Sequence, residues 1–257
     1  SMFRKFLILL LLPFTGFAQS FSTLVNKEIE ATQGQYTAWY QQLHKTPELS
    51  TQEVNTSAYL KKTLSEAGYT IMDSLGFYSF AAVLKNGNGP VILYRTDMDG
   101  LPVKEQTGLP FASEATYIKE GQPVSAMHAC GHDIHMSSWL GTATLLSRIR
   151  KQWSGTLIFL AQSAEETGQG ARKMIASPAF GRLPKPDFQL AFHDNADLPA
   201  GQIGFCDGYS MAAVDMMNIT IYGKGGHGAA PQQAIDPVLL SAQYITAIQY
   251  IVSSNFS

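Results

Sequence analysis

Residues 127–135 bring three histidines, one cysteine and one aspartate together within a short stretch of the chain. Cysteine thiolates and neutral imidazoles both bind borderline-soft divalent cations, and clusters of these residues are typical of metal sites. The small residues Ala129 and Gly131 allow the backbone to bend, so that Cys130 and His132 can approach one cation. The alternative is structural: a loop that enters a helix, in which the histidines cap and pack and Cys130 is a small buried apolar residue.

Potential ligands also follow three predicted strands, at the point where each strand ends. The carboxyl ends of parallel strands lie at one edge of an open α/β sheet, where such sheets bind their ligands. We therefore expect a metal site at this edge. The strands and the residues after them are 91–95 with Asp97 and Asp99, 156–162 with Glu165 and Glu166, and 187–192 with His193.

The two acidic pairs suit different tasks. Adjacent carboxylates at a strand end face opposite sides, so one of Glu165 and Glu166 can bind a metal while the other reaches a water. Asp97 and Asp99 are two residues apart and point the same way. Each pair alone would also fit a solvated acidic turn, and its repetition at successive strand ends is what favours a metal site.

Helices are predicted between these strands. Apolar residues recur at the helical period over residues 22–45 and 134–149. Residues 50–53, Ser-Thr-Gln-Glu, have the form of a capping box, which predicts a second helix that begins there and ends before Gly68. The strand 156–162 is continuously apolar, as is typical of a buried parallel strand, and 187–192 has the same character. The fold class is therefore α/β, with a mainly parallel sheet flanked by helices.

The pattern changes near residue 212. Alternation over residues 214–222 predicts a strand in a sheet with one solvated face, and a helix is predicted from 236 to about 253. We therefore expect a first domain over residues 19–212, which carries the candidate metal ligands, and the start of a second domain over 213–257.

Composition describes an ordinary globular protein. The chain has 257 residues, of which 45% are hydrophobic, and a formal net charge of -2. It lacks the basic stripe that a nucleic-acid phosphate backbone requires, which excludes nucleic acid as the expected partner.

The first 18 residues have the form of a secretory signal peptide. Two cations precede the apolar run 6–12, and small residues lie near a cleavage point after Ala18. The apolar run is too short to span a membrane, and Ser1 before the initiator Met2 is interpreted as a remnant of cloning. We expect cleavage and an exported protein, periplasmic or secreted, without stable membrane insertion after cleavage; the alternative is an uncleaved signal that acts as an anchor.

An oxidising compartment raises the question of a disulfide. The chain has only two cysteines, Cys130 and Cys206, and their pairing is the structural alternative to a metal site. Because Cys130 lies among histidines whereas Cys206 lies between Phe205 and Asp207, we favour a metal-binding Cys130 and a packed, unpaired Cys206.

Taken together, these segments resemble the aminoacylase/carboxypeptidase family of dinuclear metallohydrolases, and within it the branch of hippurate hydrolases and auxin-conjugate amidohydrolases. The likeness covers almost all of the chain after the signal peptide, and His-Ala-Cys-Gly-His-Asp is its most specific motif. It implies a zinc-exopeptidase-like fold with an inserted α+β lid, or dimerisation, domain. The segments that carry it are 44–49, 95–102, 127–135, 164–166, His193 and 223–231.

The resemblance also implies a ligand set for two divalent ions, zinc or manganese, with cobalt or nickel as alternatives. The Cys130 thiolate would bridge the two ions. In sister branches a histidine occupies the place of Asp97, so a ligand role for Asp97 stays open. The implied ligands are Cys130, His132, Glu166 and His193.

Three further roles follow from the same resemblance. Glu165 would be the general base, and Asp99 would orient a metal-binding histidine. His227 resembles a lid histidine that stabilises the developing oxyanion, often across a homodimer formed by the lid.

We therefore expect an exported metal-dependent amidohydrolase or peptidase that cleaves an amide bond in N-acyl amino acids or small peptides. The family pattern continues beyond Ser257 with the rest of the lid and a final ligating histidine, so we expect a fold truncated at the C-terminus and little activity from these 257 residues alone. Two alternatives remain: a non-catalytic exported metal- or ligand-binding protein with the same fold, and a hydrolase that uses Cys130 as its nucleophile.

Overall fold

The computed structural model describes residues 14–210 and 217–255. The chain forms two compact units, the first ending at Asp197 and the second beginning at Leu198. The first unit holds α1 (Phe14–Lys45), α2 (Val54–Glu66), β1 (Thr70–Met72), β2 (Phe80–Asn86), β3 (Val91–Asp97), β4 (Thr116–Lys119), β5 (Gln122–Ser125), α3 (His132–Arg148), η1 (Arg150–Gln152), β6 (Gly155–Gln162), α4 (Gly170–Ile175), η2 (Phe180–Arg182) and β7 (Phe188–Ala191). The second unit holds η3 (Pro231–Gln233) and α5 (Pro237–Asn255).

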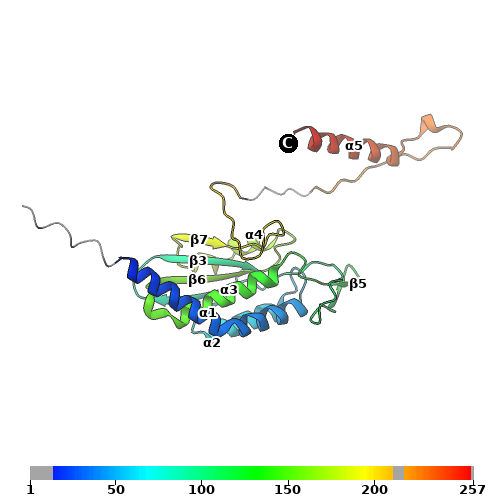
Figure 1. The fold of residues 1–257 in the computed structure, drawn as a ribbon. Coiled ribbons are helices and arrows are strands. Elements are labelled where there is room, and N and C mark those ends of the chain that lie inside the picture. Colours follow the sequence, from blue (N-terminus) through cyan, green and yellow to red (C-terminus); the bar gives the residue numbers. More distant parts are fainter. Residues whose placement is uncertain (1–13, 211–216, 256–257) are drawn as a thin grey trace, which may run out of the picture. The chain divides into compact units, whose positions relative to one another are not determined.

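A five-stranded sheet in the order β1-β2-β6-β3-β7 forms the centre of the first unit (Figure 1). β3 is parallel to both β6 and β7, whereas β2 is antiparallel to β1 and β6. The sheet is therefore mostly parallel, as predicted, with β2 as the strand that runs the other way. The register places Asp97 of β3 beside Gln162 of β6, so both strands end at the same edge.

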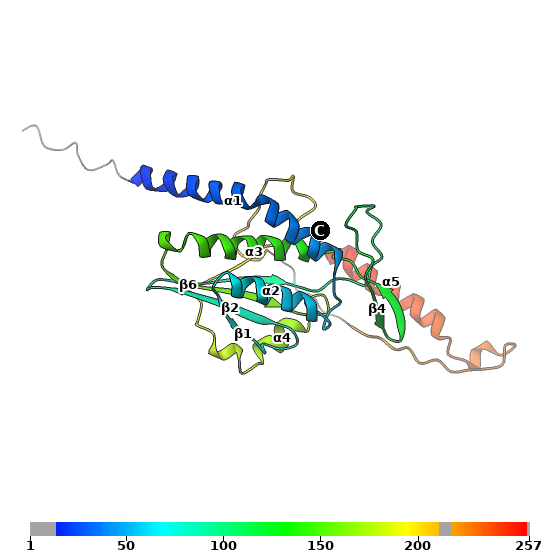
Figure 2. The same ribbon diagram turned by 90° about the horizontal axis from the view of Figure 1, so that it is seen from below.

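Side chains of the central strands alternate between two cores, one on each face of the sheet. In β6, Phe159 packs with α2 and α3, whereas Ile158 and Leu160 pack on the opposite face with Met174 of α4. Helices α1, α2 and α3 gather on the first face, which Figure 2 shows from below. The continuously apolar sequence of β6 therefore reflects burial on both faces, as expected for a strand in the middle of a sheet.

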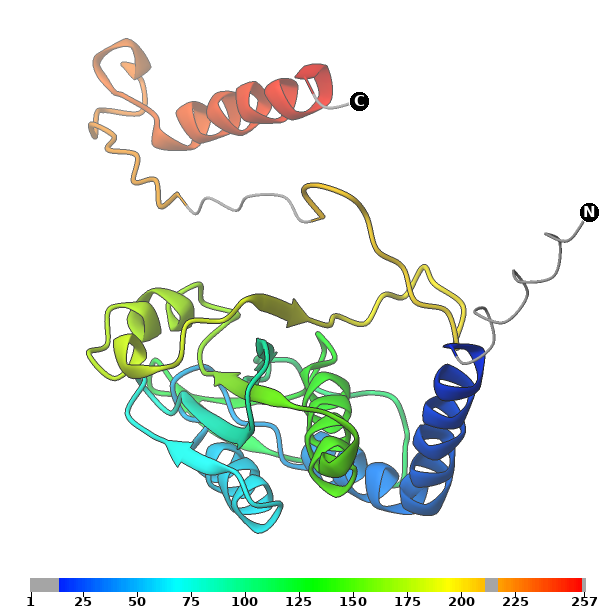
Figure 3. The same ribbon diagram turned by 90° about the vertical axis from the view of Figure 1, so that its left-hand side faces the viewer.

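β7 differs from this pattern and from the prediction of a buried strand. It lies at one edge of the sheet and pairs with β3 (Figure 3). All four of its residues are exposed, with Phe188 at 61% and Leu190 at 57%. The apolar run predicts a strand correctly, but its edge position leaves its faces uncovered by the described residues.

The start of α2 corrects another prediction. Glu53 is the N-cap residue, but it makes no side-chain cap hydrogen bond, so the predicted capping box is wrong. Instead, the buried carboxylate of Glu48 accepts the backbone N–H groups of Asn55 and Thr56 at 3.0 and 2.7 Å. The hydroxyl of Ser50 donates to Asp99 at 2.5 Å. The carboxylate of Glu48 therefore caps α2 in place of the predicted capping box. The motif residues Ser50 and Glu53 make their contacts with other parts of the fold.

Predictions at the two ends of the chain are tested only in part. Of the expected signal peptide, residues 1–13 lie outside the described residues and residues 14–18 belong to α1. Of the strand expected over 214–222, residues up to 216 lie outside the description, and 217–222 form no strand. α5 confirms the predicted last helix. Among the described residues, no helix has the length and apolar character needed to cross a membrane.

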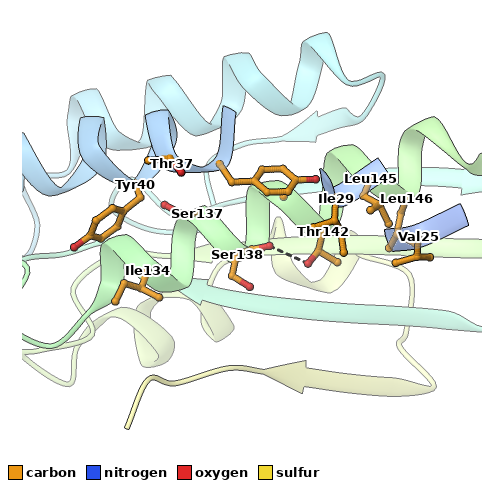
Figure 4. A pocket seen from close by; sticks show the side chains of 12 residues that line it. Val25, Ile29, Thr37, Tyr40, Ile134, Ser137, Ser138, Thr142, Leu145 and Leu146 are labelled. Carbon is orange, nitrogen blue, oxygen red and sulfur yellow. Dashed lines mark hydrogen bonds between the residues drawn. The ribbon is translucent and has the colours of Figure 1, made fainter. Parts of the chain in front are cut away.

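A groove of about 700 Å³ runs between α1 and α3, lined mainly by apolar side chains (Figure 4). Val25 and Ile29 face it from α1, and Leu145 and Leu146 from α3. None of the predicted metal ligands lines this groove, so it lies apart from the expected chemistry.

Candidate metal centre

The candidate site lies where the carboxyl ends of β3, β6 and β7 meet the beginning of α3. Gly131 makes this junction possible: it is the N-cap residue of α3 in a left-handed conformation, with φ of 73°. A Cβ atom on Gly131 would lie 2.3 Å from Oδ1 of Asp194, and the positive φ disfavours residues with a side chain, so glycine is the residue that suits this position. The turn therefore presents Cys130 and His132 to the end of the sheet.

The four predicted ligands and the predicted base come together in two groups that share His132. In each group the potential donor atoms lie within 4.8 Å of one another. Nε2 of His132 lies 3.7 Å from Oε1 of Glu166 and 3.8 Å from Oε2 of Glu165. Sγ of Cys130 lies 3.5 Å from Nε2 of His193. The groups are Cys130, His132 and His193, and His132, Glu165 and Glu166.

Unpaired polar atoms show that this donor set suits a cation. Both ring nitrogens of His132 and Oε1 of Glu166 are buried and have no hydrogen-bond partner. A buried polar atom without a hydrogen bond costs about 1–3 kcal/mol, and a bound cation would remove this cost. Thiolate, imidazole and carboxylate are the donors that Zn²⁺ and similar divalent ions accept in proteins, and the residues therefore fit a metal centre.

Negative charge dominates the site. Burial lowers the pKa of His132, but the nearby carboxylates of Asp99, Asp97 and Glu166 outweigh it and raise the pKa to about 9. Burial and the charges of Glu166 and Glu165 raise the pKa of the Cys130 thiol to about 12. Both shifts favour positive charge at the site, which a bound cation would supply.

Asp99 contacts the turn that carries the two glutamates. Its Oδ1 and Oδ2 accept the backbone N–H groups of Glu165 and Glu166 at 3.1 and 3.0 Å. Its Oδ1 lies 3.6 Å from Nδ1 of His132, which is an ion-pair distance and longer than a normal hydrogen bond. Asp99 thus holds the backbone of the turn beside His132, and its role in orienting that histidine stays a prediction.

A group of hydrogen-bonded side chains around the buried His135 lies beside the site, and the sequence analysis did not predict it. Nδ1 of His135 lies 2.7 Å from Oδ1 of Asp97, and Nε2 of His135 lies 2.9 Å from Oδ1 of Asp194. Arg95 also pairs with Asp97 at 2.6 Å. The signal was available: His132 and His135 are three residues apart, so they lie on one face of a helix. Asp97, His132 and His135 form a further group of potential donors.

Other predicted residues lie outside these groups. His227 is exposed in the second unit, where its Nδ1 accepts the backbone N–H of Ala229 at 3.1 Å. Cys206 is exposed in the same unit, so the prediction that it is packed is wrong. Both cysteines are free thiols. Because they belong to different units, the expectation that they do not form a disulfide stays a prediction.

Several known proteins are similar to this chain. An N-acetylcysteine deacetylase of Bacillus subtilis (strain 168) is 42% identical over 217 residues, covering 84% of this chain and 54% of that protein. An N-acetyldiaminopimelate deacetylase of Limosilactobacillus reuteri (strain DSM 20016) is 39% identical over 218 residues, covering 83% and 55%. The chain thus spans about half the length of these relatives.

Solved structures agree with the fold. An aminohydrolase from methicillin-resistant Staphylococcus aureus has a TM-score of 0.72 at 26% identity, covering 92% of this chain and 60% of the other. A Bacillus subtilis protein described as a dinuclear metal-binding peptidase of the M20 family has a TM-score of 0.62 at 39% identity, covering 70% and 48%. These neighbours confirm the predicted fold class.

The family model described as Peptidase family M20/M25/M40 matches residues 93–253, a stretch that includes every candidate ligand. Since this match extends over more than half of the chain, the chain belongs to Peptidase family M20/M25/M40.

Proposed function

We propose that the protein carrying this chain is a metal-dependent amidohydrolase that removes the acyl group from N-acyl amino acids. The observation that supports it most is His132, which is 1% exposed, has no hydrogen-bond partner for either ring nitrogen and belongs to both donor groups. In this proposal Cys130, His132, Glu166 and His193 hold two divalent ions, of which zinc and manganese are the first candidates.

The chemistry divides between the ions and the chain. When bound, divalent ions would polarise the scissile carbonyl and make a water more acidic. Glu165 takes a proton from the attacking water as the oxygen bonds to the carbonyl carbon, and it delivers that proton to the departing amine nitrogen as the amide bond breaks. Glu165 suits this role because its side chain is 39% exposed and lies beside His132, whereas that of Glu166 is 17% exposed.

Asp99 and Asp97 support the ligands. Asp99 holds the backbone of Glu165 and Glu166 and lies beside His132, so it orients base and ligands together. Burial would raise the pKa of Asp97, but His135, Arg95 and His132 outweigh it and hold the pKa well below its usual range. Asp97 is therefore charged and positions His135.

The raised pKa of Cys130 argues against the cysteine-hydrolase alternative. A nucleophilic cysteine needs a lowered pKa, supplied by neighbouring cations or a helix N-terminus. Here burial and the charges of Glu166 and Glu165 raise the pKa of Cys130 to about 12 instead of lowering it. A thiol in this environment is better suited to binding a cation.

The finer parts of the proposal come from the resemblance. We propose that residues 19–212 belong to the catalytic domain and 213–257 to a lid that forms a homodimer, with His227 stabilising the oxyanion. Export through the signal peptide and membership of the hippurate and auxin-conjugate branch belong to the same proposal. Analytical ultracentrifugation and the location of the protein after cell fractionation test the dimer and the export.

Hydrolysis assays test the main proposal. The purified protein is stripped with a chelator, reloaded with zinc or manganese, and assayed against N-acetylcysteine, N-acetyldiaminopimelate and hippurate. We expect activity to disappear with the metal and to return with it, and hippurate cleavage would place the protein in the predicted branch. Activity that survives complete metal removal would contradict the proposal.

A substitution separates the enzyme from a non-catalytic metal-binding protein. Glu165→Gln removes the base but preserves the size of the side chain, so we expect turnover to fall by at least about 100-fold with unchanged metal content. Glu66→Gln at the exposed end of α2 is the control and should leave both unchanged. Equal activity of the Glu165 variant and the wild type would favour another base.

A further inference from the structure

Glu53 is a fully buried carboxylate for which the proposed chemistry has no use. It lies at the N-cap of α2, is 0% exposed, and makes no side-chain cap hydrogen bond with its own helix. Burying a carboxylate is costly unless its oxygens are hydrogen-bonded, so its partners indicate what it holds. Burial raises the pKa of Glu53, and hydrogen bonds from Ser163 and Ala164 offset part of this shift.

Both partners belong to the turn that follows β6. Oε1 of Glu53 accepts the backbone N–H of Ala164 at 2.7 Å, and Oε2 accepts the hydroxyl of Ser163 at 2.5 Å. The backbone N–H of Ser163 in turn donates to Oγ of Ser79 at 3.0 Å. These contacts join the loop before α2 to the two residues that immediately precede Glu165 and Glu166.

The turn needs this support because its backbone is strained. Ala164 has φ of 52°, in the left-handed region, which costs a residue with a side chain about 1–2 kcal/mol. Such a conformation persists only when the surroundings hold it in place. The carbonyl of Ala164 accepts the N–H of Gly170 at 2.9 Å, and a Cβ on Gly170 would lie 1.6 Å from the carbonyl oxygen of Ser163.

The conformation of Ala164 determines the direction of the side chains of Glu165 and Glu166. Directly after Ala164, the N–H groups of Glu165 and Glu166 point to Asp99, and their carboxylates lie beside His132. Two buried carboxylates therefore hold four consecutive residues: Glu53 holds 163 and 164, and Asp99 holds 165 and 166.

We infer that Glu53 is a positioning residue of the metal centre, which fixes Ala164 in its left-handed conformation and thereby aims Glu165 and Glu166 at His132. Its effect on catalysis rests on the proposed function, whereas its effect on the turn does not. Glu53 acts only through the residues that it holds.

Glu48 is a matched control in the same loop. It is also a buried glutamate, 3% exposed, and it also accepts backbone N–H groups, but those belong to Asn55 and Thr56 at the beginning of α2. Loss of Glu48 should destabilise the fold in a similar way without releasing the turn. A comparison of Glu53→Ala with Glu48→Ala therefore separates positioning from general stability.

Hydrogen exchange on the metal-free protein tests the turn directly. We expect Glu53→Ala to speed exchange of the amides of residues 163–166 by at least about 10-fold, which corresponds to about 1.4 kcal/mol, while Glu48→Ala leaves them near the wild-type rate. Equal exchange in the two variants would overturn the inference. This measurement does not depend on whether the protein is a hydrolase.

Cobalt titration, followed by the visible absorption of the bound ion, tests the consequence for the site. Loss of a group that orients metal ligands typically weakens affinity by about 10–100-fold, and we expect this for Glu53→Ala but not for Glu48→Ala. With substrate, kcat should fall and KM should change little. Absence of cobalt binding in the wild type would instead reject the proposed function and leave the exchange result to decide the inference.

Two milder variants keep the test decisive if Glu53→Ala does not fold. In Glu53→Gln the amide can accept the N–H of Ala164 and donate to the hydroxyl of Ser163, so we expect exchange, affinity and kcat to recover to within a few-fold of wild type. Ser163→Ala removes one of the two contacts and should give an intermediate effect. Wild-type exchange and affinity in Ser163→Ala, or no recovery in Glu53→Gln, would overturn the positioning account.

Discussion

The two halves of the candidate metal centre differ in how firmly the fold holds them. One half, with His132 and Glu166, is built on α3 and on β6, which has strands on both sides. The other half, with His193, follows the edge strand β7. The side chain of His132 is 1% exposed, whereas that of His193 is 45% exposed.

This difference lies in how many contacts hold each half in place. Packing on both sheet faces and buried carboxylates determine where the ligands of the buried half lie. The exposed half has fewer such constraints, and we expect bound metal to contribute more to its order. Changes that affect the two halves unequally therefore test the comparison.

The largest expected effect comes from the strands themselves. Leu160 of β6 is 4% exposed, so Leu160→Ala should destabilise the fold by about 2–5 kcal/mol through lost burial and a cavity. Leu190 of β7 is 57% exposed, and Leu190→Ala should change stability by less than about 0.5 kcal/mol. Urea denaturation of both variants measures the difference. Similar losses would mean that β7 is packed in solution and that the two halves do not differ.

Loss of individual ligands should come next. His132 belongs to both donor groups, so His132→Ala should weaken metal affinity by on the order of 100-fold or more, beyond the effect of supporting residues. His193→Ala removes a ligand from one group and should cost less. Competitive titration with a chromophoric chelator measures both. A greater loss of metal affinity in His193→Ala than in His132→Ala would mean that the exposed half contributes more to metal binding.

The sequence predicts the exposed half and the buried half equally well in outline, but not their difference. Types and spacing identify Cys130, His132 and the strand ends, because parallel strands bring their carboxyl ends to one edge. Exposure of β7 could not be predicted, because an apolar run of this length describes a central strand or an uncovered edge strand equally well.

Long-range contacts of the loop before α2 were also beyond the sequence. Residues 50–53 match a local capping pattern, and that pattern contains no information about a turn more than a hundred residues away. The hairpin of β4 and β5 was missed for a different reason. Its turn at Glu120 and Gly121, with φ of 53° and 76°, has a recognisable glycine, but the strands on either side are only four residues long and half of their residues are polar.

A matched pair of glycines tests how tightly the turn after β6 is packed. A Cβ on Gly170 would meet the carbonyl oxygen of Ser163 at 1.6 Å, so Gly170→Ala should cost about 1–3 kcal/mol and weaken metal binding. Gly181 has no atom within 4 Å of that position, and Gly181→Ala should be nearly neutral. Thermal unfolding of both variants, with and without metal, measures the loss of stability and the effect on metal binding. A neutral Gly170→Ala would show that the turn can relax and that the buried half is less rigid than we infer.

The smallest effect that we predict is a pH dependence of stability that comes from His44, which contacts Asp133 next to the buried half. His44 of α1 contacts Oδ2 of Asp133 at 2.6 Å and Oε1 of Glu105 at 3.0 Å, and the rings of Tyr40 and Phe111 pack against it. Burial lowers the pKa of His44, but the hydrogen bonds with Glu105 and Asp133 outweigh it and raise the pKa above its ordinary value.

A pKa that is higher in the folded than in the unfolded state gives stability at low pH. The contribution of His44 should be complete below about pH 6.5, the pKa of an unfolded histidine, and should be lost as the pH rises through the folded-state value. In His44→Gln the side chain does not titrate, so the stability gap to wild type should be widest below about pH 6.5 and narrow as the pH rises. Urea denaturation of both proteins over that range measures it, and a gap that widens with pH would mean that His44 is neutral between its two carboxylates.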